Sequence, residues 1–174
     1  MRVVAGKWAG KPLISPAGRV RPTTETLRDQ WITILEPDLE GARVLDLFSG
    51  SGALGIEALS RGARYVDFVE NHPSALHALK ANIAVTRSKE RVRIYKHDAI
   101  PFVEKLEAGR YDIALADPPY GSRKADRIIE YWMQVRFARI LCVEHAPDHK
   151  LPGRGQTRNF GDNAITFFRA RSSP

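Results

Sequence analysis

This chain of 174 residues has no long apolar run and a single cysteine. The one cysteine, Cys142, excludes a disulfide within the chain and is typical of a cytoplasmic protein. No apolar stretch is long enough for a membrane span, and the first residues lack the apolar run of a signal peptide. We therefore expect a soluble cytoplasmic protein that makes no contact with membranes.

Acidic residues are missing from the first 24 positions, which carry five lysines and arginines. Residues 150–174 carry five more against one acid, so the ends of the chain hold more than the whole net charge of +7. Basic ends on a nearly neutral body predict binding to a polyanion, and Trp8 among the charges adds a ring on which bases could stack. The predicted RNA-contacting residues are Arg2, Lys7, Trp8, Lys11, Arg21, Thr23, Arg123 and Lys124.

Strand and helix patterns alternate from residue 43 onward. Strands are predicted at 43–47, 65–69, 91–96, 111–116 and 138–144, and helices at 53–61, 73–85, 99–107 and 124–136. This order predicts an α/β fold with a mostly parallel twisted sheet and helices on both faces. Residues 157–160 and 164–170 flank Gly161-Asp162-Asn163 and predict a closing antiparallel hairpin.

The residues before this alternation predict an extension. Residues 1–14 suggest a small β-hairpin or arm, and 24–35 a helix that Pro37 ends. We expect residues 1–40 to form an RNA-binding arm and helix, and 41–174 to form the catalytic domain.

A glycine-rich turn follows the first predicted strand of the alternation. Gly50, Gly52 and Gly55 match G-x-G-x-x-G, which alone would suggest a dinucleotide site. Asp46, four residues before the first glycine, would repel phosphate and attract a cation. Glu70 and Asp98 lie at the ends of the next two strands, where they could bind ribose hydroxyls and an adenine amino group.

A ribose and an adenine joined to a cation describe S-adenosylmethionine, which is the cofactor we predict. The expected cofactor-binding residues are Asp46, Phe48, Gly50, Gly52, Glu70, Asp98, Ala99 and Asp117. For Phe48, a place in the ordinary core is an equal alternative.

The segment Asp117-Pro118-Pro119-Tyr120 follows the predicted strand 111–116. The prolines fix their own φ and leave their carbonyl oxygens free to accept, beside the Asp117 carboxylate. Two such acceptors suit an exocyclic amino group of a nucleobase, and the Tyr120 ring could stack on that base. We predict that Asp117, Pro118, Pro119 and Tyr120 form the catalytic segment of an amino-group methyltransferase.

Together these residues resemble the RsmD family of bacterial small-subunit rRNA guanine-N2 methyltransferases. The segments that carry the resemblance are Arg2–Trp8, Arg21–Thr24, Val44–Gly62, Phe68–Glu70, Asp117–Tyr120 and Phe160–Phe168. The resemblance implies a Rossmann-like class I methyltransferase fold. It also implies that guanine N2 of small-subunit (16S) rRNA is the target, in an assembled or partly assembled subunit.

Other readings of the motifs stay open at this point. The Asp-Pro-Pro-Tyr box also resembles that of adenine-N6 methyltransferases acting on DNA or RNA, and the glycines alone would fit an NAD-dependent oxidoreductase. His145 and His149 flank Pro147 without a supporting cysteine, so no metal site is expected. We expect a monomer.

Overall fold

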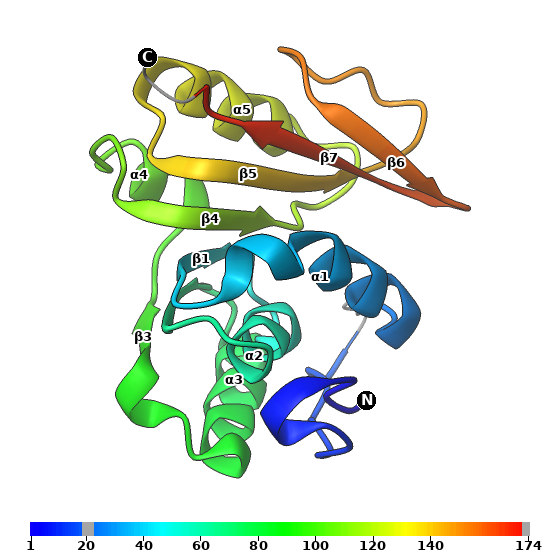
Figure 1. The fold of residues 1–174 in the computed structure, drawn as a ribbon, viewed down its shortest axis with the longest axis vertical. Helices are drawn as coiled ribbons and strands as arrows, with labels where there is room; N and C mark the ends of the chain where they lie inside the picture. The colour runs from blue at the N-terminus through cyan, green and yellow to red at the C-terminus, as the bar shows by residue number, and fades with distance from the viewer. Residues whose placement is uncertain (19–22, 172–174) are drawn as a thin grey trace.

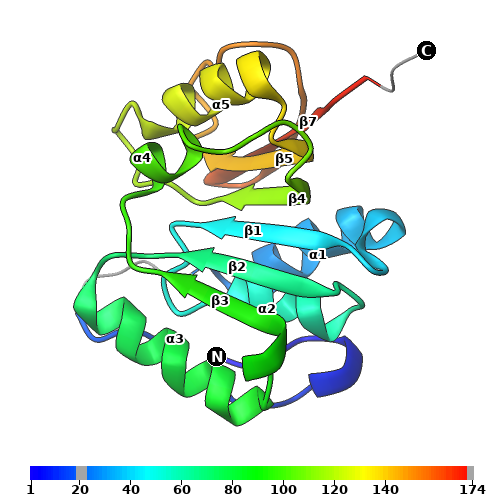
Figure 2. The ribbon, with the colours of Figure 1, turned by 90° about the vertical axis from the view of Figure 1, so that its left-hand side faces the viewer.

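The computed structural model describes residues 1–18 and 23–171, in which the strands form one seven-stranded sheet (Figure 1). The strand order is β3-β2-β1-β4-β5-β7-β6. The strands are β1 (Arg43–Leu47), β2 (Tyr65–Val69), β3 (Val92–Tyr95), β4 (Tyr111–Ala116), β5 (Ala138–His145), β6 (Gln156–Phe160) and β7 (Asn163–Arg169). Figure 2 shows β4, β1, β2 and β3 side by side and pointing the same way.

The last two strands run against the rest of the sheet. β7 pairs antiparallel with both β5 and β6. The predicted α/β class, parallel body and closing hairpin are thereby confirmed, with boundaries shifted by a residue at most for this hairpin.

Helices cover both faces of the sheet. They are α1 (Glu25–Leu39), α2 (Ala53–Ser60), α3 (Pro73–Thr86), α4 (Ala99–Val103) and α5 (Lys124–Val135), with 3-10 turns η1 (Gly6–Trp8) and η2 (Lys89–Arg91). Residues of α1, α2, α3 and the N-terminal segment share one apolar core, and those of α4 and α5 share the other. Because both faces are covered, strands such as β1 and β4 are almost wholly buried, which explains their continuous apolar sequences. No helix in the described ranges is long and apolar enough to cross a membrane.

Three local predictions are wrong. The helix predicted at 99–107 ends at Val103 as α4, because the N–H groups of Lys105 and Leu106 donate to carbonyl oxygens three residues back, in turns and not in a continuing α-helix. Helix α1 continues through Pro37 to Leu39, because a proline near the end of a helix removes few hydrogen bonds while Leu35 and Leu39 remain buried. Residues 1–14 form no regular hairpin: one bridge joins Arg2 to Pro12, and η1 lies between them.

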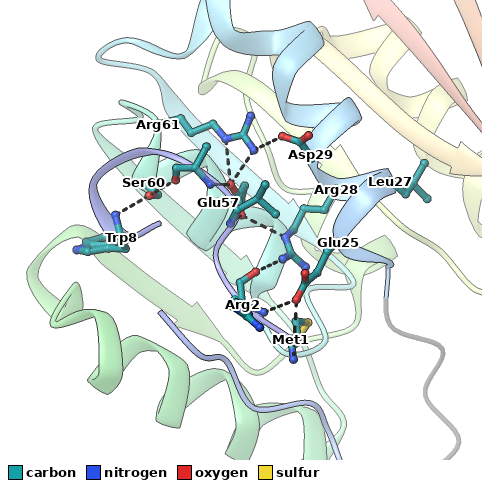
Figure 3. Close-up of polar contacts among 12 residues, drawn as sticks. Met1, Arg2, Trp8, Glu25, Leu27, Arg28, Asp29, Glu57, Ser60 and Arg61 are labelled. Atoms are coloured by element: carbon teal, nitrogen blue, oxygen red, sulfur yellow. Dashed lines mark hydrogen bonds and ion pairs between the residues drawn. The ribbon is translucent and has the colours of Figure 1, made fainter. Parts of the chain in front are cut away.

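The N-terminal segment is held on α2 by a buried carboxylate (Figure 3). Glu57 accepts hydrogen bonds from the backbone N–H groups of Val4 and Ala5, each at 2.9 Å. The same carboxylate pairs with Arg28 of α1 at 3.3 Å and with Arg61 at 2.8 Å. The first residues of the chain are therefore attached to the body of the fold through charge as well as through apolar contacts.

Candidate functional site

A cavity of about 580 Å³ opens at the carboxyl edge of the parallel strands. Its walls include Asp46 from β1, Gly50 from the glycine-rich turn, Glu70 after β2, and Asp117 and Tyr120 after β4. In open parallel sheets this edge is where ligands bind. The fold therefore brings three of the four strand-end acids predicted from the sequence into one cavity.

The conformation of the glycine-rich turn leaves no space for a Cβ atom at Gly52 or Gly55. Gly52 has φ +78° at the start of α2, and a Cβ there would lie 2.3 Å from Leu79 Cδ1. A Cβ at Gly55 would lie 2.5 Å from Phe68 Cε1 and 2.9 Å from Asp46 Oδ2. These glycines allow the turn to pack tightly beside the Asp46 carboxylate.

Glu70 fixes the turn from the neighbouring strand. Its Oε2 accepts from the Gly50 N–H at 2.8 Å, and its Oε1 accepts from the N–H groups of Asn71 and His72 at 2.8 and 2.9 Å. Three backbone donors hold the carboxylate in one orientation on the cavity wall. Such a carboxylate is suited to binding a pair of hydroxyls.

Asp46 is 2% exposed and accepts a hydrogen bond from the Gly55 N–H at 3.0 Å. Burial raises the pKa of the Asp46 carboxyl well above its usual range; the Gly55 bond opposes this, and the charges of Asp117 and Glu70 add to it. A cation in the cavity would stabilise the ionised form of this cluster.

A second cavity, of about 280 Å³, lies next to the first and is lined by Asp98 and Ala99. Phe48 and Lys124 line both cavities, with the Lys124 ammonium 5.7 Å from the centre of the Phe48 ring. Phe48 has φ +56°, a conformation that costs a bulky residue about 1–3 kcal/mol and is characteristic of functional sites. Asp98 also accepts from Asn71 Nδ2 at 2.7 Å, so the two cavities share a polar boundary.

The segment after β4 forms part of the wall of the larger cavity. Pro118 is buried, whereas Pro119 and Tyr120 are exposed, with Tyr120 41% accessible. Thr23, which the sequence assigns to RNA contact, donates its hydroxyl hydrogen to Asp117 Oδ2 at 2.9 Å. The N-terminal segment thus reaches the carboxylate predicted to hold the target amino group.

Trp8 does not offer a stacking surface, and that expectation is wrong. Its side chain is 6% exposed within the core formed with α1 and α2, and its backbone N–H donates to Ser60 Oγ at 2.9 Å. Lys7 and Arg91 lie about the ring, at 6.0 and 5.9 Å from its centre. The basic residues around Trp8 cover it instead of flanking an open ring.

Most of the other predicted RNA contacts that the structure describes lie on separate parts of the surface. Arg2 and Lys7 are exposed near η1, and Arg123 and Lys124 are exposed at the start of α5. Lys11 is partly buried and donates to the Val85 carbonyl oxygen at 3.3 Å. Arg21 lies outside the described residues.

Some residues of the cavity were missed by the sequence reasoning. Glu144 and Asn163 line it from β5 and β7, and Asn71 lies beside Glu70. Glu144 lies at the end of a predicted strand, so the rule that selected the other acids could have selected it. Asn163 gave no such signal, because its place depends on the register of the antiparallel pair.

Comparison with known proteins identifies the family. The family model described as "Conserved hypothetical protein 95" matches residues 1–166. A protein of Haemophilus influenzae named ribosomal RNA small subunit methyltransferase D is 31% identical over 158 residues, covering 87% of this chain and 81% of that protein. The chain belongs to the RsmD family.

Solved structures agree with the class I methyltransferase fold. The RsmD-family chain superposes on yhhF of Escherichia coli with a TM-score of 0.85 and 26% identity, covering 99% of both chains. The N-terminal domain of human METTL16, solved in complex with SAH, gives a TM-score of 0.69 over 91% of this chain and 75% of that one, at 15% identity. At that identity the likeness shows a shared fold.

The cofactor of this RsmD-family chain is S-adenosylmethionine. The cavity fits it, because Asp46, Glu70 and Asp117 make an acidic surface for a sulfonium cation and the glycine-rich turn leaves room beside them. Asp98 and Ala99 of the smaller cavity would hold the adenine, with Phe48 between the two cavities.

Proposed function

We propose that this protein transfers a methyl group from S-adenosylmethionine to the exocyclic N2 of a guanine in small-subunit rRNA. The observation that carries the proposal is that the Asp117–Tyr120 segment lines one cavity together with Asp46 and Glu70. The name of the Haemophilus influenzae relative supports rRNA as the substrate. We further propose that the substrate is an assembled or partly assembled subunit in the cytoplasm, and that residues 1–40 and 41–174 act as RNA-contacting and catalytic parts.

Positioning supplies most of the proposed catalysis. The guanine amino lone pair is delocalised into the ring, so it must be turned toward the electrophile. Asp117 Oδ and the Pro118 carbonyl oxygen each accept a hydrogen bond from one N–H of the amino group. These hydrogen bonds orient the lone pair and disperse the positive charge that develops on nitrogen. The bound cofactor supplies an electrophilic methyl group, and Asp117 or a water takes the proton.

Tyr120 stacks on the target base in this proposal. Its ring lies at the exposed rim of the cavity, next to the rigid Pro118-Pro119 pair. A base that is paired in a helix would have to be extruded to reach this ring, whereas an unpaired base would not.

The test is transfer of a labelled methyl group to small subunits from cells that lack this enzyme, with naked rRNA in parallel. The product is digested to nucleosides and separated. We expect N2-methylguanosine, with faster transfer to subunits. N6-methyladenosine would overturn the assignment of the base, and an absence of transfer to either substrate would overturn the proposed function.

A further inference from the structure

The hydroxyl group of Tyr120 is held by residues from two other strands. It donates to Glu144 Oε1 at 3.0 Å and lies 3.4 Å from the carbonyl oxygen of His145, both at the end of β5. Asn163, the first residue of β7, donates from Nδ2 to the Tyr120 hydroxyl at 2.8 Å and to Glu144 Oε1 at 2.6 Å. The three side chains form a closed triangle of hydrogen bonds.

The strand pairing brings the triangle together. β5 and β7 are antiparallel neighbours (Figure 1). In their register Glu144 lies opposite Ile165 and His145 opposite Ala164. Asn163 therefore lies beside the end of β5, although it is 19 residues from Glu144 in sequence. All three members of the triangle line the larger cavity.

Burial of the Glu144 side chain is unfavourable for folding. It is 4% exposed, and in residues 1–18 and 23–171 no lysine or arginine forms an ion pair with it. Its Oε2 is buried and accepts no hydrogen bond from the described residues. Burying a carboxylate without a cation is unfavourable, so stability alone does not account for it.

We propose that Glu144 and Asn163 are positioning residues that hold the Tyr120 ring for methyl transfer; this rests on the function proposed above. The ring is restrained at one end by the backbone after Pro118-Pro119 and at the other by its hydroxyl. A ring fixed at both ends presents one stacking plane to the target base, so the amino group reaches Asp117 already aligned. Alignment of this kind lowers the activation barrier more than it changes ground-state binding.

The experiment is a double-mutant cycle on the purified full chain. Tyr120→Phe removes the hydroxyl and keeps the ring, and Glu144→Ala removes its acceptor. Each single variant is expected to lower kcat about tenfold, with KM for RNA within about threefold and cofactor affinity unchanged. The double variant is expected to lose no more than either single variant, because both changes break the same contact.

Glu144→Gln is the conservative rescue, since its amide oxygen can still accept from Tyr120; it should recover most of the kcat lost in Glu144→Ala. Tyr131→Phe is the matched control, because Tyr131 of α5 lies outside the triangle and its hydroxyl donates to the carbonyl oxygen of Glu104, just after α4, at 2.6 Å. Its kcat should equal that of wild type. If Glu144→Ala does not fold, the cycle of Tyr120→Phe with Asn163→Ala gives the same test.

Additive losses in either cycle would overturn the positioning role, because they would mean that Glu144 or Asn163 acts independently of the hydroxyl. Unchanged kcat in Tyr120→Phe would overturn it too. Tyr120→Ala separates this failure from failure of the proposed function. A fully active Tyr120→Ala refutes stacking itself, whereas an inactive Tyr120→Ala with an active Tyr120→Phe refutes only the triangle.

Discussion

Replacing Glu57 by alanine should destabilise this protein more than any change to a surface charge. Glu57 is fully buried. Its carboxylate accepts hydrogen bonds from two backbone N–H groups of the N-terminal segment and forms ion pairs with two arginines (Figure 3). After the change, Arg61 would keep Asp29 at 2.8 Å and Glu36 at 3.2 Å. Among the described residues, the side chain of Arg28, which is 0% exposed, would keep only its hydrogen bond to the Arg2 carbonyl oxygen.

The magnitude follows from leaving the Arg28 charge buried and unpaired. Removing one partner of a buried ion pair costs about 3–5 kcal/mol, which is a large part of the roughly 5–15 kcal/mol by which a domain is stable. For a chain of this size each kcal/mol lowers Tm by about 2–4 °C. We therefore expect Glu57→Ala to lower Tm by about 6–20 °C.

Thermal unfolding followed by circular dichroism would measure this shift. Glu104→Ala is the matched control, because it breaks an ion pair with Arg127 at 3.1 Å whose side chains are 48% and 57% exposed. That pair should be worth at most about 1 kcal/mol. If Glu57→Ala lowered Tm by no more than Glu104→Ala does, the reasoning would be refuted.

Four further predictions concern the cavity and the RNA surface. Burial raises the pKa of Asp46 above its value in the unfolded chain, so the ionised carboxylate opposes folding. Asp46→Asn should therefore raise Tm at about pH 8. The gain in Tm should vanish toward about pH 4, where the carboxyl is protonated in the folded protein and increasingly in the unfolded chain. A gain independent of pH would exclude the charge as its cause. Asp117→Ala should nearly abolish methyl transfer while weakening cofactor binding much less, because Asp46 and Glu70 remain; turnover above about a tenth of wild type would contradict its anchoring role. Glu70→Ala should weaken cofactor binding by about 1–3 kcal/mol in calorimetry, whereas undiminished affinity would remove Glu70 from the site. Lys7→Ala should lower the salt slope of RNA binding by about 0.7–0.9 if the exposed ammonium contacts one phosphate; an unchanged slope in filter binding would place the RNA elsewhere.

The sheet and most of the cavity were predictable from the sequence because their signals are local. An apolar run followed by glycine or an acid marks a strand end, and the parallel arrangement brings such ends to one edge. Asp46, Glu70 and Asp117 each carried that signal. The parts missed by the prediction depend on contacts between distant segments.

Trp8 shows why distant contacts matter. Lys7 beside a tryptophan is typical of a nucleic-acid surface, yet two residues from far along the chain hold Trp8 in place: Ser60 of α2 accepts from its backbone N–H, and Arg91 of η2 lies over its ring. Asn163 shows the same dependence, because the register of β7 against β5 places it beside Tyr120. A local pattern gives the residue type and its neighbours, whereas burial is decided by the tertiary packing.

The position of the N-terminal segment changes how RNA binding should be tested. Val3, Trp8 and Leu13 are buried in the core, and Thr23 contacts Asp117 at 2.9 Å. Deleting residues 1–12 would therefore expose apolar surface and leave Glu57 without its backbone donors, so a loss of RNA binding would not distinguish lost contacts from an unfolded protein. Single substitutions at exposed charges avoid this ambiguity, because they leave the core intact. Lys7 near η1 and Arg123 at the start of α5 are such charges on separate parts of the surface, so comparing their salt slopes would locate the RNA while the fold is held constant.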